Sequence, residues 1–345
     1  MSSPAPYWVS TDDWHTAGEP FRIVPTLPAH CHTLGPTVKD RRRNILSSPD
    51  HPLDLLRRVL CQEPRGHADM YGGFIVPPND DGAHLGVLFW HKDGFSTACG
   101  HGTLALGFWS IESGLVKAPS DGVTDVVIDV PSGRVTARVT TQGGKPVHAD
   151  FINVPSYQVV DQLSVHLPSL GKDILLDISW GGALYAFVDS TESIGLKVIE
   201  TNHDAFVSLG REIKAVLGDE ARHRELELYG VCFYDKLASD ESSLTQRNCV
   251  VFADGQIDRS PCGSGSAARV ALLYAQGQLA EGQVLHHHSI INTVFDGSIV
   301  STENVNPFSP YPAVIPMVRG SANLMSQSRF YIDSADPTFP GFVFR

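Results

Sequence analysis

The chain has 345 residues, more than the ~250–300 that a single hydrophobic core usually serves, so two domains are expected. Hydrophobic residues make up 42% and charged residues 19% of the chain, which is typical of a globular protein in water. The net charge of −12 argues against nucleic acid or an anionic membrane as a partner, because both repel an acidic surface.

The sequence also lacks the signals of export and membrane insertion. No uninterrupted apolar run approaches the ~18 residues that a membrane-spanning helix needs. The first residues, MSSPAPYWVSTDDWH, contain neither a basic segment nor an apolar core, so they do not resemble a secretory signal. We therefore expect a cytoplasmic protein.

Short segments rich in β-branched and aromatic residues, bounded by Gly, Pro or Asp, predict strands, and only a few segments have helical character. In chain order, the expected elements are a helix at 50–61, strands at 72–78 and 85–91, a helix following Cys99, strands at 126–130, 134–140, 174–180 and 183–188, a helix at 204–217 and a helix following Cys262. We expect a loop at the Pro-rich segment 307–316. The three histidines at 286–288 have no acidic or cysteine ligand at metal spacing, so a partly exposed strand is expected there.

This pattern predicts an α+β fold of two pseudo-symmetric, β-rich domains, each around one central helix. We place the first domain at 1–155 and the second at 156–324. A C-terminal strand at about 325–345 is expected to return to the first domain.

Two stretches of the chain repeat each other. ACGHGTLA at 98–105 and PCGSGSAA at 261–268 both read Cys-Gly-x-Gly-[Thr/Ser]-x-Ala, and a glycine follows each cysteine after fifteen residues (114 − 99 and 277 − 262). The cysteines are 262 − 99 = 163 residues apart, close to half of the chain. This spacing indicates duplication of a whole domain.

A cysteine at the start of a helix points to chemistry. The first turn of a helix has backbone N–H groups without partners and a positive dipole end, which stabilise a thiolate and lower its pKa. The same N–H groups bind carboxylates, and glycines let a ligand approach the backbone. Two such helix starts could hold one small carboxylate with a thiol on each side, which is what 1,1-proton transfer at an α-carbon requires. That scheme needs neither a metal nor another cofactor.

The repeat is also compatible with roles apart from proton transfer. The two glycine-rich helix starts could serve packing alone, or could bind a small carboxylate without catalysis. A hydrolase with a Cys99–His101 pair is disfavoured because residues two apart on a helix do not face each other. Cys31, Cys61, Cys232 and Cys249 lie among apolar or mixed residues and are expected to be buried thiols.

The repeated motifs resemble those of a known family. ACGHGTLA and DRSPCGSGSA are similar to the two signature motifs of the proline racemase family, which includes proline racemases, 4-hydroxyproline 2-epimerases and trans-3-hydroxy-L-proline dehydratases. Further resemblance lies in HTAGEPFR at 15–22, with Ala17 where the family has glycine, in EPRGHADMYG at 63–72, in ISWGGALYAFV at 178–188 and in DPTFPGFVFR at 336–345. The resemblance thus covers nearly the whole chain.

The resemblance implies a fold like that of diaminopimelate epimerase, with the substrate, a proline or hydroxyproline, in the cleft between two domains of a cofactor-independent enzyme. It also implies a homodimer. By motif position, Cys99 and Cys262 are the acid/base thiols, and Asp258 receives the ring nitrogen. The resemblance assigns carboxylate contacts to Gly100, His101, Gly263 and Ser264, and aromatic pocket walls to Tyr71 and Phe252.

The branch within the family follows from fewer residues. Cysteine at 262 resembles racemases and epimerases, because the dehydratases typically carry threonine there. RGHADMYG, HLGVLF, GSGSAARVALLY and GFVFR look more like the dehydratase branch. Tyr71 stands where racemases have phenylalanine. A buried phenol hydroxyl without a hydrogen-bond partner costs ~1–3 kcal/mol, and a substrate with its own hydroxyl group would remove this cost. Trans-3-hydroxy-L-proline dehydration is the leading prediction, and racemisation or 2-epimerisation with two thiols is the alternative.

Overall fold

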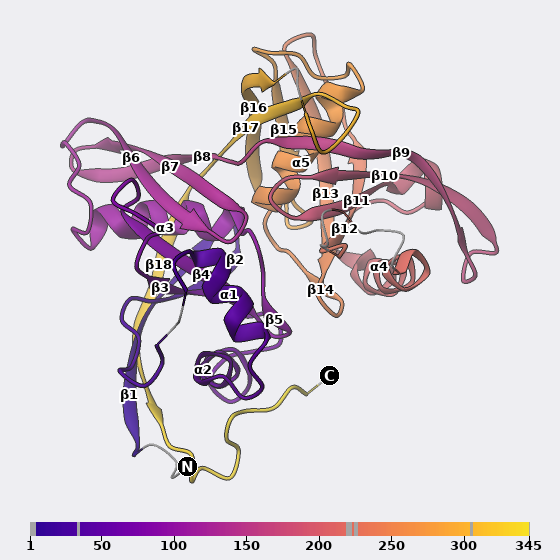
Figure 1. The fold of residues 1–345 in the computed structure, drawn as a ribbon. Helices are drawn as coiled ribbons and strands as arrows, with labels where there is room; N and C mark the ends of the chain where they lie inside the picture. The colour runs from indigo at the N-terminus through magenta and orange to yellow at the C-terminus, as the bar shows by residue number, and fades with distance from the viewer. Residues whose placement is uncertain (1–4, 33–34, 219–222, 224–226, 304–305, 345) are drawn as a thin grey trace. The chain divides into compact units, whose positions relative to one another are not determined.

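The computed structural model describes residues 5–32, 35–218, 223, 227–303 and 306–344 (Figure 1). The chain divides into two compact units. Unit 1 comprises Met1–Val147 together with Ser321–Arg345, and unit 2 is the intervening segment His148–Gly320. The boundaries expected at 155 and 324 therefore lie a few residues beyond those of the compact units.

Unit 1 is a mixed sheet with one long buried helix and two further helices packed on it. The strands pair in the order β18 (Ala322–Ile332), β1 (Tyr7–Thr16), β2 (Glu19–Val24), β3 (Gly72–Val76), β4 (Leu85–His91), β6 (Gly122–Val130) and β7 (Gly133–Gln142). The pairs β2–β3 and β4–β6 are parallel, and the short β5 (Gly94–Phe95) also pairs with β4. Helix α3 (Gly100–Glu112) contacts β1, β2, β6, β7 and β18, whereas α1 (Val38–Leu46) and α2 (Pro52–Cys61) contact β4.

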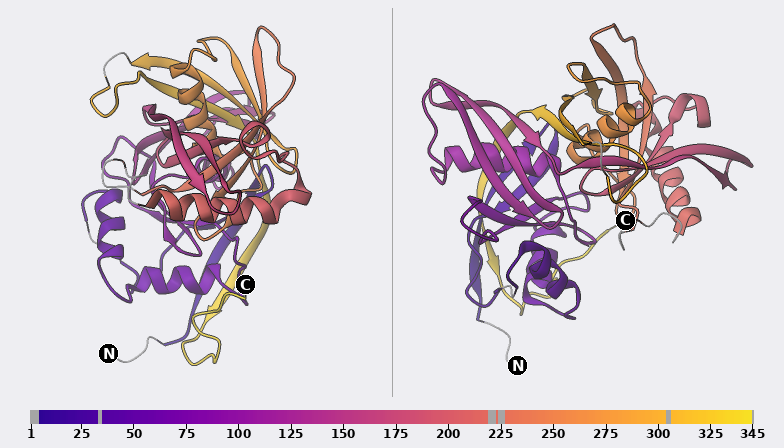
Figure 2. Two further views of the ribbon diagram at one scale, coloured as in Figure 1. Left: turned by 90° about the vertical axis from the view of Figure 1, so that its right-hand side faces the viewer. Right: turned by 45° about the horizontal axis from the view of Figure 1, so that its top comes forward.

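Unit 2 is a closed ring of strands around α5 (Gly263–Ala275), as Figures 1 and 2 show. The ring runs β9 (Ser156–Leu167), β10 (Lys172–Trp180), β11 (Leu184–Asp189), β12 (Gly230–Lys236), β13 (Ser243–Phe252), β15 (Val284–His288), β16 (Val294–Glu303) and β17 (Ala313–Gly320), and β17 pairs again with β9. Strand β8 (Lys145–Ile152) pairs with the other end of β17, β14 (Gln256–Ile257) pairs with β13, and α4 (His203–Leu217) packs on β9, β12 and β13. Two short turns of helix, Ser190–Ile194 and Glu200–Asn202, precede α4.

The two units share one strand topology. The order α2, β3, β4, β5, α3, β6 in unit 1 recurs as α4, β12, β13, β14, α5, β15 in unit 2. Parallel pairs occur at the same places, β2–β3 and β4–β6 in unit 1 and β11–β12 and β13–β15 in unit 2. The α+β fold with two pseudo-symmetric halves, each around one helix, is therefore confirmed.

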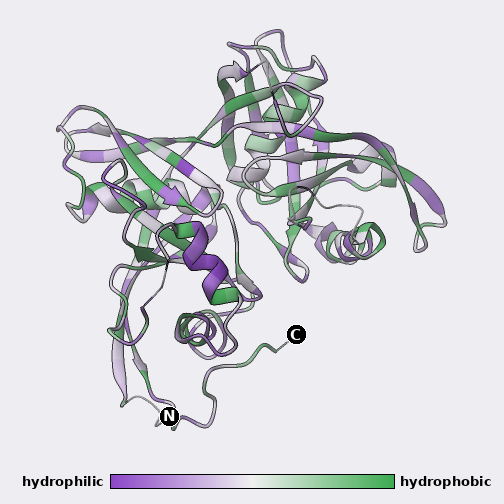
Figure 3. Ribbon diagram, in the orientation of Figure 1, coloured by the Kyte–Doolittle hydropathy of each residue, from purple (hydrophilic) through white to green (hydrophobic). Residues whose placement is uncertain are grey.

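Composition explains why α3 and α5 are central. Both helices are buried on every side, and apart from His101 and Arg269 they contain only small and apolar residues and hydroxyl-bearing serines or threonines over their buried lengths. In Figure 3, α5 is white to green, whereas the surface helix α1, with the sequence VKDRRRNIL, is largely purple. In the part of the chain that the structure describes, no helix is long and apolar enough to cross a membrane.

Every predicted strand and helix is present, but two segments of the C-terminal part have bounds that differ from those expected. The segment 307–316 is not a loop throughout, because β17 begins at Ala313. Pro316 fits this strand because it pairs with Ile299 beside a register shift in β16, the kind of position at which strands tolerate proline. The C-terminal strand, β18, ends at Ile332, and residues 333–344 form turns and irregular backbone with one isolated bridge.

Candidate active site

The first half-site is built on the start of α3. Cys99 is the N-cap of this helix, with extended backbone angles (φ −155°, ψ 103°), and its Sγ accepts a hydrogen bond of 3.2 Å from the Gly102 N–H. A Cβ atom on Gly102 would lie 2.8 Å from that sulfur, so only glycine leaves room for it. The thiol therefore lies at the helix start, as the glycine spacing predicted.

His101 contacts the same sulfur, contrary to expectation. Its Nδ1 and Nε2 atoms lie 3.5 and 3.6 Å from the Cys99 Sγ. The spacing rule fails because Cys99 is extended rather than helical, which turns its side chain toward the ring. Burial lowers the pKa of His101 to about 3, so the imidazole is neutral. The neutral ring disfavours a hydrolase-type thiolate–imidazolium pair.

Tyr71 forms an aromatic wall beside this half-site. Its ring is buried and meets the His101 ring edge to face at 5.0 Å. Its hydroxyl is hydrogen-bonded to the Ser96 hydroxyl. The argument that this phenol needs a hydroxyl from the substrate was therefore wrong, since Ser96 already satisfies it.

The second half-site is built on the start of α5. Cys262, the N-cap of that helix, has φ +62° and ψ 106°, a region that residues other than glycine rarely occupy. Its N–H donates to the Ser260 Oγ at 3.1 Å and its carbonyl accepts from the Ser266 N–H at 2.7 Å, and these bonds hold the strained backbone. A Cβ atom on Gly265 would lie 2.9 Å from the Cys262 sulfur, matching the relation of Gly102 to Cys99.

Tyr185 on β11 connects two residues of this half-site. Its hydroxyl lies 3.6 Å from the Cys262 Sγ and 2.7 Å from the Ser264 Oγ. Its ring packs edge to face on Tyr229 at 5.6 Å, and Tyr229 stacks on Phe252 at 5.7 Å. The predicted site residues Cys262, Ser264 and Phe252 are thus joined through two tyrosines.

Sequence reasoning assigned no role to these tyrosines, although two signals were available. Tyr185 lies in the quoted motif ISWGGALYAFV. Tyr229 precedes Gly230 at the start of β12 as Tyr71 precedes Gly72 at the start of β3, and these strands occupy matching places in the two units.

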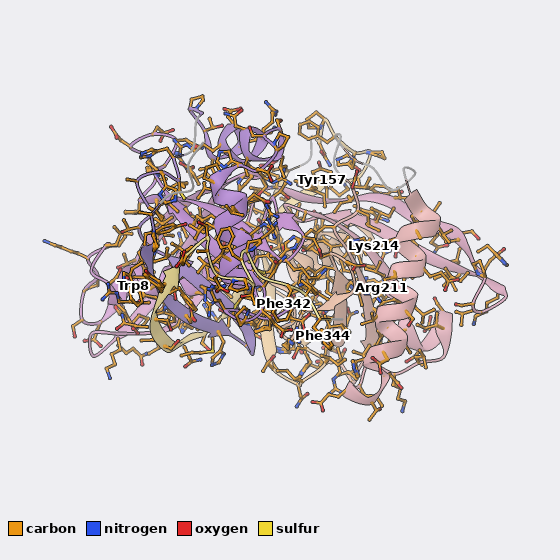
Figure 4. The ribbon with its side chains drawn as sticks, turned by 90° about the horizontal axis from the view of Figure 1, so that it is seen from below. Trp8, Tyr157, Arg211, Lys214, Phe342 and Phe344 are labelled. Carbon is orange, nitrogen blue, oxygen red and sulfur yellow. The ribbon has the colours of Figure 1, made fainter. Side chains whose placement is uncertain are left out.

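Helix α4 holds the backbone that carries Tyr229 and Phe252. The Lys214 Nζ donates to the carbonyls of Tyr229 at 3.3 Å and Ala253 at 2.8 Å. One turn earlier, Arg211 donates to the carbonyl of residue 254 at 2.8 Å. Figure 4 shows both cationic side chains on α4. They fix the ends of β12 and β13 at which the two aromatic rings meet.

Asp258 is the buried acid of this half-site. It accepts hydrogen bonds from the N–H of Ser260 at 2.8 Å and from the Ser260 hydroxyl at 2.7 Å. Burial nevertheless raises the pKa of its carboxyl group above the ordinary value. A buried carboxylate of this kind is suited to pairing with a cationic group.

The thiol of Cys262 was expected to have a lowered pKa, and this is wrong. Burial raises the pKa of Cys262 well above its ordinary value, and the Asp258 carboxylate raises it further. The Tyr185 hydroxyl and the Gly265 N–H lower the pKa, but they do not offset burial. Cys262 therefore rests as a neutral thiol, the form that donates a proton.

The remaining predicted contacts lie where the helices begin. Gly100 and Gly263 are the first residues of α3 and α5, whose intrahelical bonding starts three residues later with the N–H groups of Thr103 and Ser266. Their N–H groups are therefore not needed by the helix. The structure brings Cys99, Gly100, His101 and Tyr71 together in unit 1, and Cys262, Gly263, Ser264, Asp258 and Phe252 together in unit 2.

The other cysteines and the histidine triplet lie outside these half-sites. As expected, all four remaining thiols are buried, and burial raises the pKa of each: Cys31, Cys61, Cys232 and Cys249. The triplet forms the partly exposed strand β15, in which His286 pairs with Asp296 at 2.7 Å and His287 contacts the Ser266 Oγ at 2.8 Å. Within the described residues, no cluster of three or more His, Cys, Asp or Glu could hold a metal ion.

Comparison with known proteins identifies the family. The sequence model described as proline racemase matches residues 12–343. This chain belongs to the proline racemase family. It is 39% identical to a trans-3-hydroxy-L-proline dehydratase of Burkholderia cenocepacia (strain HI2424) over 347 residues, covering 98% of both chains. It is also 39% identical over 347 residues to a 3-hydroxyproline 2-epimerase of Burkholderia multivorans (strain ATCC 17616 / 249), again with 98% of both chains covered.

A solved structure agrees with this family assignment. The crystal structure of a hydroxyproline epimerase from Agrobacterium vitis, with bound trans-4-hydroxy-L-proline, matches 98% of this chain and 96% of its own with a TM-score of 0.87 and 25% identity. The predicted class, a dehydratase or a racemase/epimerase of the proline racemase family, is confirmed.

Proposed function

We propose that this enzyme removes the α-proton of trans-3-hydroxy-L-proline with the Cys99 thiolate, and that loss of the 3-hydroxyl group then gives the dehydrated product. The observation that carries the proposal is the Cys99 sulfur at the start of α3, facing the Gly102 N–H at 3.2 Å. This N–H stabilises a thiolate at the position from which a base would act. The name of the Burkholderia cenocepacia relative supports the choice of substrate.

The proposed steps balance. The thiolate takes the α-proton, and the C–H electron pair forms a double bond between the α- and β-carbons. The C3–O bond breaks with its electron pair, and the hydroxide takes up a proton equivalent to the one removed from the α-carbon and leaves as water. The resulting enamine then gains a proton on C3 and loses one from the ring nitrogen, which gives a cyclic imine, pyrroline-2-carboxylate.

The residues around the thiols would hold the substrate. The first-turn N–H groups at Gly100 and Gly263, together with His101 and Ser264, would bind the carboxylate and stabilise the charge that develops at the α-carbon. The buried Asp258 carboxylate would pair with the ring ammonium. Tyr71 and Phe252 would flank the ring.

A second function, racemisation or 2-epimerisation, is favoured by the setting of Cys262. This residue rests as a thiol at the start of α5, in a strained backbone conformation held by Ser260. A thiol that protonates the opposite face of the α-carbon would complete a two-thiol 1,1-proton transfer. The relative from Burkholderia multivorans, at the same identity, bears the name of an epimerase.

The substitution Cys262→Thr separates these two functions. Wild type and variant would each be incubated in heavy water with L-proline, trans-4-hydroxy-L-proline and trans-3-hydroxy-L-proline. Deuterium at the α-carbon reports epimerisation, and a cyclic imine reports dehydration. If dehydration dominates, the variant keeps most imine formation and loses epimerisation by orders of magnitude, because a hydroxyl is far too weak an acid to replace a thiol. Loss of both reactions would contradict the leading proposal.

The thiol mechanism itself is tested at Cys99. Replacing the base removes the first step, so Cys99→Ala should reduce turnover of every substrate by at least ~10²-fold, while circular dichroism and the melting temperature stay close to wild type. Thiol alkylation should inactivate the wild type, and pyrrole-2-carboxylate should protect it because this planar compound mimics the deprotonated intermediate. A non-catalytic carboxylate-binding protein would bind that compound and turn over none of the substrates.

The homodimer and the cytoplasmic location also stay predictions, which light scattering and cell fractionation would test.

A further inference from the structure

Tyr185 lies between two groups that the proposed reaction uses for different purposes. Its hydroxyl is 3.6 Å from the Cys262 Sγ and 2.7 Å from the Ser264 Oγ, and its ring is fully buried. Cys262 would handle the proton, whereas Ser264 would hold the carboxylate. Because a phenol has one hydrogen, it can donate to only one of these neighbours at a time.

The protonation state of Cys262 decides which neighbour receives that hydrogen. When Cys262 is a thiol, its S–H donates to the Tyr185 oxygen, and the phenol donates to Ser264. The Ser264 hydroxyl is then free to donate to a substrate carboxylate. After Cys262 gives its proton to the α-carbon, the phenol donates to the thiolate, and the Ser264 hydroxyl turns to donate to Tyr185. Each hydroxyl keeps its own hydrogen and only rotates.

We infer that Tyr185 is a positioning residue that couples the proton on Cys262 to the hydrogen bond between Ser264 and the substrate carboxylate. The inference rests on the proposed roles of Cys262 and Ser264. The enzyme would hold the carboxylate best while Cys262 still carries its proton, and would loosen that contact once the proton has been delivered. By linkage, a bound carboxylate would in turn favour the thiol form of Cys262.

The other groups around Cys262 do not provide this coupling. Asp258 and the buried thiol of Cys232 both act against a thiolate at Cys262, and the Gly265 N–H is a fixed backbone donor. Of these four groups, Tyr185 is the one whose side chain is hydrogen-bonded to the Ser264 hydroxyl. In unit 1, the residue matching Ser264 is His101, which contacts its cysteine directly at 3.5 Å. The coupling is therefore expected at Cys262 and not at Cys99.

The variant Tyr185→Phe tests the inference in the free enzyme, without any turnover. The thiolate of Cys262 would lose a donor, which is expected to raise its pKa by about one unit. At pH 8, modification of Cys262 by methyl methanethiosulfonate should therefore be about tenfold slower than in wild type, as measured by peptide mass spectrometry. Cys99 in the same sample is the internal reference and should react at its wild-type rate.

Two further variants control the experiment. Tyr157→Phe removes the hydroxyl of another buried tyrosine of unit 2, which contacts His223 at 2.9 Å, and should leave Cys262 reactivity unchanged. Ser264→Ala keeps the contact between Tyr185 and Cys262, so Cys262 reactivity should stay within about twofold of wild type. Its affinity for pyrrole-2-carboxylate should nevertheless fall several-fold. Melting temperatures would establish that each variant is folded.

The outcomes are distinguishable from failure of the proposed function. In Tyr185→Phe, kcat for deuterium exchange at the α-carbon should fall about tenfold, with little change in KM. The pH profile of this exchange rate should also differ from that of wild type. An unchanged Cys262 rate, or equal slowing of Cys262 and Cys99, would overturn the inference. If none of the three prolines were turned over, the proposed function would be rejected. The rates of Cys262 modification could still be interpreted, because they are measured without turnover.

Discussion

At the scale of single residues, the two cysteines have matching sequence positions but different surroundings. Cys99 is extended and touches the neutral ring of His101, whereas Cys262 has a positive φ and lies beside the Asp258 carboxylate. Burial and the Asp258 carboxylate keep Cys262 protonated at rest. In the proposed reaction, Cys262 would therefore be the proton donor and Cys99 the proton acceptor.

The first residue-scale prediction concerns pH. The pKa of the Asp258 carboxyl group is raised by burial, so this group gains a proton at a pH above its ordinary value of about 4. As pH falls through that raised pKa, the carboxylate that would pair with the substrate ammonium is lost. The Kd for L-proline should therefore rise up to tenfold per pH unit below it, measured by titration calorimetry with Cys99→Ala to prevent turnover.

A matched ligand and a matched variant isolate this effect. Pyrrole-2-carboxylate has no ammonium group, so its affinity should not weaken over the same pH range. Asp258→Asn should bind L-proline about 10–100-fold more weakly at neutral pH and should lose the pH dependence. If the affinities for the two ligands depended equally on pH, Asp258 would be excluded as the partner of the ring nitrogen.

At the scale of elements, the starts of α3 and α5 position the sulfurs through glycine. In Gly265→Ala, the new Cβ would lie 2.9 Å from the Cys262 Sγ, so the sulfur must rotate away from its place. Alanine also favours the helix by about 1 kcal/mol over glycine, so stability should change little while α-carbon exchange falls at least tenfold. Exchange kinetics and thermal melting would measure both.

Gly171→Ala should show the opposite pattern. Gly171 lies in the turn between β9 and β10 with φ +61°, and no atom lies within 4 Å of the position that a Cβ would occupy. The strain of this backbone conformation should cost about 1 kcal/mol of stability and leave exchange unchanged. Similar behaviour of the two variants would mean that Gly265 serves packing rather than placement of the sulfur.

The sequence allowed the helix starts to be predicted because their signals are local. Cysteine, the two glycines and the hydroxyl residue lie within five positions, and the repeat shows that they belong together. The contacts that were misjudged or missed depend on structural features that the residue types alone do not determine. His101 meets Cys99 because the N-cap backbone is extended, Ser96 meets Tyr71 across 25 residues, and Tyr185 meets Cys262 across 77. Such contacts depend on the local backbone conformation and on how distant segments pack, which a single sequence does not specify.

At the scale of the whole molecule, unit 2 is continuous in sequence and closed by the pairing of β17 with β9. We therefore expect residues 148–320 to fold alone, with cooperative thermal unfolding and a buried Cys262 that reacts slowly with thiol reagents. Residues 1–147 should not unfold cooperatively, because β1 has lost its pairing with β18. Joining 321–345 to residue 147 through a short linker should restore cooperative unfolding. Cooperative unfolding of 1–147 without that addition would show that β18 is dispensable.

The pairing of the first strand with the last also sets an order of events on the ribosome. β1 emerges first, but its neighbour β18 is made more than 300 residues later (322 − 7 = 315), roughly 15–60 s at ordinary rates of synthesis. Unit 2 emerges in full before that strand does and is the first able to reach its native state. During this interval β1 has a bare edge, the kind of surface that chaperones shield from aggregation. A stop codon at the start of β18, near position 322, would release a chain whose second unit is complete and whose β1 never gains its partner strand.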